Sequence, residues 1–155
     1  MNDLTLLLMR QKDLYERSIE AFDELRQTLR HNSSGAGVSA AVHKTEPVLA
    51  ELGELDEDIG EYLRRCGKKT LYEEIEAQTD AAERETVMRL FDGTAKLQLE
   101  LKNVIDNVKD LLRRSKLFVD FHLNVASKVQ ADSTYGPPGA TETATQSRKI
   151  FDANA

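Results

Sequence analysis

The C-terminal half of the sequence contains an apolar repeat of unusual length. From Thr79 to Gln130, apolar and small polar residues recur in alternating steps of four and three, the spacing of one helix face. At about 1.5 Å per residue, a single helix over this range would be roughly 75 Å long. A helix of this kind buries its apolar stripe against other helices. The repeat therefore predicts an all-α fold, an elongated antiparallel helical bundle with coiled-coil-like packing.

The composition agrees with a long-helix protein. The chain of 155 residues is rich in Leu, Glu, Ala, Lys and Arg, contains no Trp and has only 3 Pro. Charged residues make up 31% of the chain and the formal net charge is −6. Nucleic-acid-binding domains usually carry a basic stripe, and the charge balance here is the opposite. The sequence therefore predicts no nucleic-acid partner.

Two long helices and one short turn of helix precede the repeat. Turn-forming residues follow Arg30, and Gly67 has the character of a C-terminal cap. We expect helices at about 3–30, 38–66 and 70–77, followed by a very long third helix at 79–130. Pro47 lies inside the second of these ranges. It either kinks this helix or begins it, with Thr45 as the N-cap.

The last 25 or so residues are predicted to form a separate unit. Before Ile150, Tyr135 is the only sizeable apolar side chain of this tail, so little burial can offset the entropy lost on ordering. We therefore expect a helical bundle domain over 1–130 and a flexible C-terminal tail over 131–155. Ile150 and Phe151 form a second small apolar spot, which either folds back on the bundle or stays free.

The apolar arc of the long helix widens towards its C-terminal end. Over residues 97–112 the apolar positions span about 120° of the helix circumference, with Leu99 outside the arc. Over residues 117–129 they span roughly 240°. Either the protein's own helices cover both sides of this end, or part of the arc is a groove site for an amphipathic segment of another protein.

No grouping of catalytic or metal-ligating residues stands out in the sequence. His31, His43 and His122 show no metal-ligand spacing with one another or with Cys66. Phosphate-binding loops, nucleophile elbows and dinucleotide-binding fingerprints do not occur. We therefore expect a protein without enzyme activity, metal or cofactor.

The sequence also indicates a cellular location. A single cysteine cannot form an internal disulfide bond, which favours a reducing compartment. The apolar run at 4–9 is far shorter than a membrane-spanning helix and lacks the basic start and cleavage site of a signal peptide. A soluble, cytoplasmic protein with no direct membrane insertion is expected.

The order of these features resembles the FlgN family, bacterial flagellar export chaperones for the hook–filament junction proteins. The resemblance rests on a leucine-rich first helix, a long later helix, the sequence Thr-Tyr-Gly-Pro-Pro-Gly at 134–139 and Ile-Phe-Asp at 150–152. It covers nearly the whole chain. The Tyr-Gly-x-x-Gly element after the long helix carries most of its weight.

The resemblance implies a cytoplasmic chaperone that works without ATP. Such a protein binds the C-terminal region of hook-associated junction proteins, prevents their premature assembly and delivers them to the cytoplasmic part of the flagellar type III export gate. Carried over to this chain, the client-binding residues are Leu117, Phe118, Phe121 and Val125. The residue that docks on the export gate is Tyr135.

A second class of function remains as an alternative. A structural or regulatory coiled coil that assembles with itself would show the same heptad spacing. It would bury the wide apolar end of the long helix in a stable homo-oligomer, whereas a chaperone would keep this end available to a client. The oligomeric state therefore distinguishes the two interpretations.

Overall fold

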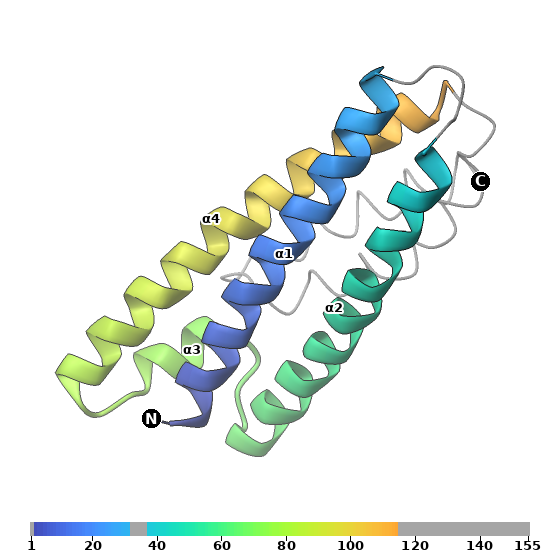
Figure 1. Cartoon of the computed structure of the whole chain (residues 1–155). Coiled ribbons are helices and arrows are strands. Elements are labelled where there is room, and N and C mark those ends of the chain that lie inside the picture. The colour runs from blue at the N-terminus through green and yellow to red at the C-terminus, as the bar shows by residue number, and fades with distance from the viewer. Residues whose placement is uncertain (1, 32–36, 115–155) are drawn as a thin grey trace.

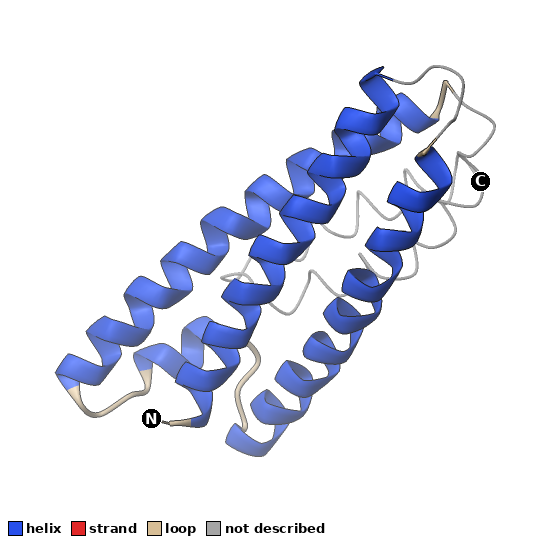
Figure 2. Cartoon of the chain, viewed as in Figure 1, coloured by secondary structure: helices blue, strands red, loops and turns tan. Residues whose placement is uncertain are grey.

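The computed structural model describes residues 2–31 and 37–114 of the chain. Within these ranges all regular secondary structure is helical and there is no strand, as predicted (Figures 1 and 2). The helices are α1 (Asp3–His31), α2 (Val38–Cys66), α3 (Leu71–Glu76) and α4 (Ala81–Leu112). The first three follow the expected boundaries to within one residue at each end.

The three long helices form an elongated bundle in which α1 lies between α2 and α4 (Figure 1). The three long helices alternate in direction along the chain, as predicted for an antiparallel bundle. As a result α1 and α4 run parallel, and this pair makes the most extensive contact in the bundle. The short helix α3 lies at the end where α1 and α4 begin, which we call the base. The opposite end is called the far end.

The very long third helix is not confirmed. Helix α4 has 32 residues, close to the 29 of α1 and of α2. It ends at Leu112, where the N–H of Arg113 donates to the Lys109 carbonyl oxygen and the following residues form a turn. The remainder of the predicted helix, and the predicted tail at 131–155, lie outside the described residues.

Local sequence signals set the helix ends around α3. Gly67 adopts the left-handed conformation (φ 67°), and the next amide, of Lys68, donates to the Leu63 carbonyl oxygen at 3.0 Å. The hydroxyl of Thr70 accepts a hydrogen bond from the Glu73 amide, which makes Thr70 the N-cap of α3. The Asp80 carboxylate caps α4 in the same way, accepting from two backbone amides of its first turn.

Helix α2 continues without interruption through Pro47. Thr45 is not an N-cap, since it lies inside the helix and its hydroxyl donates to the Val42 carbonyl oxygen at 2.6 Å. The helix begins instead at Val38, after Gly37 in the left-handed conformation (φ 78°). Of the two interpretations of Pro47, the one that starts a helix there is therefore wrong.

Three ion pairs fix the register between α1 and α2. Arg10 pairs with Asp58, Arg17 with Glu51 at 2.7 Å, and Glu24 with Lys44 at 2.6 Å. Successive pairs are seven residues apart on both helices, so they recur on the same side of an antiparallel seam. In the first two pairs α1 supplies the cation, and in the third it supplies the anion. A shift of the register by one heptad would therefore place two like charges opposite each other.

The core of the described residues consists of two clusters. The base cluster contains these buried residues: Leu4, Leu8, Leu14, Leu55, Ile59, Tyr62, Leu63, Leu71, Ile75, Val87 and Phe91. The far cluster contains these: Tyr15, Phe22, Leu25, Val38, Ala41, Val48, Leu49, Leu101, Val104, Ile105, Val108 and Leu112. Each cluster draws residues from α1, α2 and α4, and only the base cluster includes α3.

Candidate partner-binding end of the bundle

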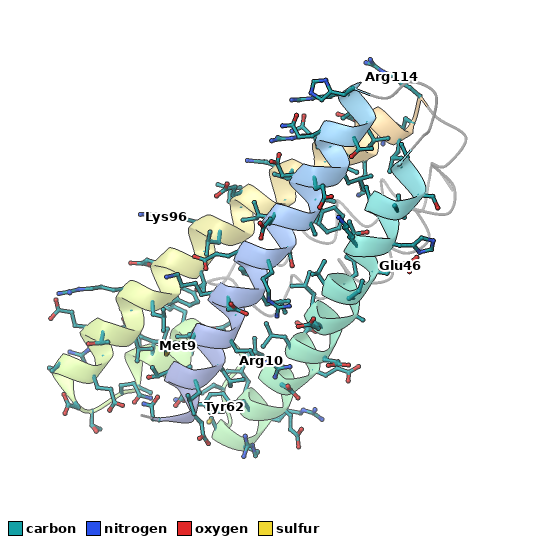
Figure 3. The ribbon with its side chains drawn as sticks, in the orientation of Figure 1. Met9, Arg10, Glu46, Tyr62, Lys96 and Arg114 are labelled. Atoms are coloured by element: carbon teal, nitrogen blue, oxygen red, sulfur yellow. The ribbon has the colours of Figure 1, made fainter. Side chains whose placement is uncertain are left out.

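The residues predicted to bind a client or the export gate lie outside the described residues. These residues are Leu117, Phe118, Phe121, Val125 and Tyr135. The structure describes instead the place from which this segment departs. The last described residue, Arg114, lies at the far end of the bundle, at the opposite end from Tyr62 (Figure 3). Arg114 therefore lies at the same end of the bundle as the end of α1 and the beginning of α2.

The last turns of α4 are firmly packed where the chain leaves the bundle. Val108 and Leu112 are fully buried, in one cluster with Phe22 and Leu25 of α1 and with Val38 at the start of α2. Burial of an aliphatic side chain contributes roughly 1.5–3 kcal/mol, so several such contacts fix the direction of α4. The candidate segment thus begins on a helix end with a defined position.

The apolar arc predicted for this part of α4 is confirmed. Leu101, Val104, Ile105, Val108 and Leu112 are buried, and Leu97 and Leu111 are partly buried. Leu99 lies outside the arc and is 61% exposed. The wider arc predicted from Leu117 onwards falls outside the described residues.

Lys109 is a buried titratable residue near the far end that the sequence analysis did not identify. Its side chain lies beside the apolar arc of α4, and the residue is only 4% exposed. Burial lowers the pKa of its ammonium group to about 8, against an opposing effect of the Asp106 carboxylate. The signal available in the sequence was weak, because a lysine at the edge of an apolar stripe usually extends to solvent.

The exposed apolar side chains of the described residues are scattered. Leu6 and Met9 lie near the start of α1, Tyr72 lies on α3, and Leu99 lies in the middle of α4. Isolated apolar side chains are common on protein surfaces and do not by themselves define a binding site. These side chains therefore define no binding site within the described ranges, and the far end of the bundle stays the candidate site.

The cysteine and histidines form no metal centre in the part of the chain that the structure describes. Cys66 is exposed at the end of α2 rather than packed in the core. His43 is paired with Glu46 at 3.2 Å on the outer surface of α2. His122 lies outside the described residues. Helices α1 to α4 also lack the combination of length and apolar character that a bilayer-spanning segment needs.

Taken together, the described fold and candidate site define a small all-helical bundle that presents a chain segment from one end. The chain matches the family described as FlgN protein over residues 1–143. It therefore belongs to the FlgN family, a family of flagellar export chaperones, as the sequence analysis inferred. No curated protein and no solved structure matches the chain.

Proposed function

We propose that this protein is a cytoplasmic chaperone for the junction proteins of the flagellum. It binds the C-terminal region of hook-associated proteins, keeps them unassembled and delivers them to the export gate. The observation that carries this proposal is the family match, which runs from the first residue to 143 and so includes both Phe118 and Tyr135. The protein acts by binding, without catalysis and without a cofactor.

The far end of the bundle supports client binding by the segment that follows α4. An amphipathic helix from a client is held best by the apolar face of another helix. Leu117, Phe118, Phe121 and Val125 share the apolar character and helical spacing that such a face needs. The packed end of α4 at Leu112 gives this face a fixed starting point on the bundle.

The predicted division of labour assigns gate docking to Tyr135 alone. This residue follows the client-binding segment by ten residues, counted from Val125, and precedes the Gly-Pro-Pro-Gly sequence at 136–139. A single aromatic side chain in a polar segment gives a weak contact that is quickly reversed. Such a contact suits delivery, since the chaperone has to leave the gate after each client.

Paired substitutions test this division. The double change Phe118→Ala and Phe121→Ala removes two aromatic anchors, so client affinity should fall by at least a hundredfold at roughly 1.5–3 kcal/mol each. Tyr135→Ala should leave client affinity unchanged and weaken binding to the purified cytoplasmic domain of the gate. The control is Leu99→Ala, which truncates an exposed apolar side chain in the middle of α4.

Calorimetric titration of each variant with one junction protein measures the client affinities. The assignment of the client site is wrong if the double variant binds the client as well as Leu99→Ala does. The division of labour is wrong if Tyr135→Ala loses the client.

A further inference from the structure

The two core clusters meet at a narrow boundary across the bundle. The boundary falls between Leu14 and Tyr15 in α1, and in α4 between Phe91 and the next buried apolar residue, Leu101. In α2 it falls at Leu52, which is only partly buried and packs against both clusters. Continuity of the apolar core between the two halves therefore depends on few side chains.

Buried polar residues occupy this boundary on both α1 and α4. Gln11 and Ser18 are 2% and 0% exposed, and Thr94 is 2% exposed. Asn2 donates to Glu83 across the parallel pair at 2.6 Å, so α4 positions match α1 positions about 81 lower. With an equal rise per residue, Thr94 lies at the height of position 13 in α1, between Gln11 and Ser18. We call these three residues the polar layer.

The hydrogen bonds of the polar layer run along single helices. Ser18 donates to the Leu14 carbonyl oxygen at 2.6 Å, and Thr94 donates to the Phe91 carbonyl oxygen at 2.8 Å. Gln11 donates to the Tyr15 hydroxyl one turn further along α1 at 3.1 Å. These bonds satisfy buried polar groups without joining α1 to α4. The layer thus interrupts the apolar contacts between α1 and α4 with side chains that bond along their own helices.

The base half contains the features that stabilise helix ends. It comprises residues 3–14, 55–66, 71–76 and 81–91. Side-chain N-caps at Thr70 and Asp80, the glycine C-cap at Gly67 and the Asn2–Glu83 bond all lie in it or at its edge. The loop that connects α2 to α4 also contributes α3 to its core, through Leu71 and Ile75.

The far half contains features that oppose folding. It comprises residues 15–31, 38–49 and 97–112. Pro47 lacks the N–H that an α-helix interior requires, and α2 begins without a side-chain cap. The Nε of Arg26 is buried with no hydrogen-bond acceptor in the described part of the chain.

We propose that the bundle consists of two cooperative units separated by the polar layer, and that the far half opens while the base half stays folded. Cooperative units of this kind are held together by contiguous apolar packing, and they open separately where this packing is interrupted. The unit that opens is the one from which the chain continues beyond Arg114. Opening would therefore change the surroundings of the segment at 115 and beyond without unfolding the protein.

Native-state hydrogen exchange of the full-length chain, measured by mass spectrometry, tests the proposal. Two matched substitutions are compared, each of which creates a cavity in one of the two halves. Leu8→Ala removes a fully buried leucine from the base cluster, and Leu25→Ala removes one from the far cluster. In the unsubstituted protein, amides of the far half should exchange faster than amides of the base half. Each substitution should accelerate the exchange of its own half by at least about thirtyfold, the smallest effect expected for a buried Leu→Ala change.

The effect on the other half distinguishes two units from one. The base half stays folded when the far half opens, so a cavity at Leu8 raises the free energies of the native and the half-open states equally. Leu8→Ala should then leave exchange of the far half unchanged. Leu25→Ala should accelerate both halves, since complete unfolding includes the far half. Equal acceleration of both halves by both substitutions would mean a single cooperative unit and would overturn the proposal.

Milder changes keep the test available if an alanine variant does not fold. Ile59→Val in the base half and Val38→Ala in the far half remove less volume from fully or almost fully buried sites. The same pattern is expected with smaller factors.

A third variant tests the role of the polar layer. Gln11→Leu combined with Thr94→Val replaces two buried polar groups by apolar ones and should bring the exchange rates of the two halves closer together. An unchanged difference between the halves would show that the layer is not what separates them.

Discussion

At the scale of single residues, Lys109 makes folding depend on pH. Its folded-state pKa is about 8, below the ordinary value of 10.5, because burial disfavours the charged form. Between these two values the unfolded chain binds more protons than the folded one. The free energy of unfolding should therefore rise as the pH increases from about 8 towards 10.5. Below pH 8 the full cost of burying the charge is present.

Lys109→Met tests this dependence. The variant lacks the titrating group, so its stability relative to the unsubstituted protein should decrease as the pH rises from 7.5 to 10. Urea denaturation at several pH values measures the difference between the two proteins. If the difference in the free energy of unfolding between the two proteins stays constant over this pH interval, Lys109 is not a buried titrating group.

Two glycines seven residues apart, Gly60 and Gly67, should respond to alanine in opposite directions. Gly67 has a φ of 67°, and an L-residue there costs roughly 1–2 kcal/mol. Gly60 lies inside α2, where an added Cβ would meet no atom within 4 Å. Gly60→Ala should stabilise the protein by about 0.5–1 kcal/mol through the higher helix propensity of alanine, whereas Gly67→Ala should destabilise it. Thermal denaturation of both variants measures the two signs, and a shared sign would contradict the assigned conformations.

The sequence predicted these residue-level features unevenly. Gln11 and Ser18 lie on the same face of α1 as its buried leucines and aromatic residues, and they are buried too. Periodicity identifies a buried face by its apolar members. It does not show that a polar side chain on that face can be satisfied by its own helix, as the Ser18 hydroxyl is by a carbonyl one turn earlier.

At the scale of the elements, the ion pairs between α1 and α2 determine register more than stability. Glu24 and Lys44 are both about half exposed, and an exposed pair contributes only about 0.2–1 kcal/mol. Glu24→Lys sets two ammonium groups against each other, and Lys44→Glu sets two carboxylates against each other. Each single change should lower the free energy of unfolding slightly, and the double change should restore it.

A double-mutant cycle by urea denaturation measures this coupling, which we expect to be about 0.5 kcal/mol. The control is Arg89→Glu on the outer face of α4. Its ion pair, with Glu85, lies within one helix, so its loss should not couple to changes at Glu24. Strictly additive effects of the Glu24 and Lys44 changes would show that the two side chains do not interact in solution.

Element boundaries were well predicted where the chain carries local signals. Gly67 and the caps at Thr70 and Asp80 are such signals, and the helices around them begin and end as expected. The end of α4 at Leu112 was not predicted, because the apolar repeat continues beyond it without glycine or proline. Periodicity alone cannot distinguish one long helix from two shorter helices that share a heptad pattern.

At the scale of the whole molecule, the sequence predicted the all-helical fold class and a helical bundle. It did not indicate that α1 would pack most extensively on the parallel helix α4 rather than on its neighbour α2. The family was inferred from a short tyrosine-containing element and is confirmed over residues 1–143. The individual client and gate residues stay predictions, since all of them follow Arg114.

The chaperone function is tested most directly by calorimetric titration of the full-length protein with an intact hook-associated junction protein from the same organism. Our account predicts submicromolar binding that is lost when the C-terminal region of the junction protein is removed. The absence of binding to any junction protein, together with a stable homo-oligomer in sedimentation analysis, would contradict it and favour a self-assembling coiled coil.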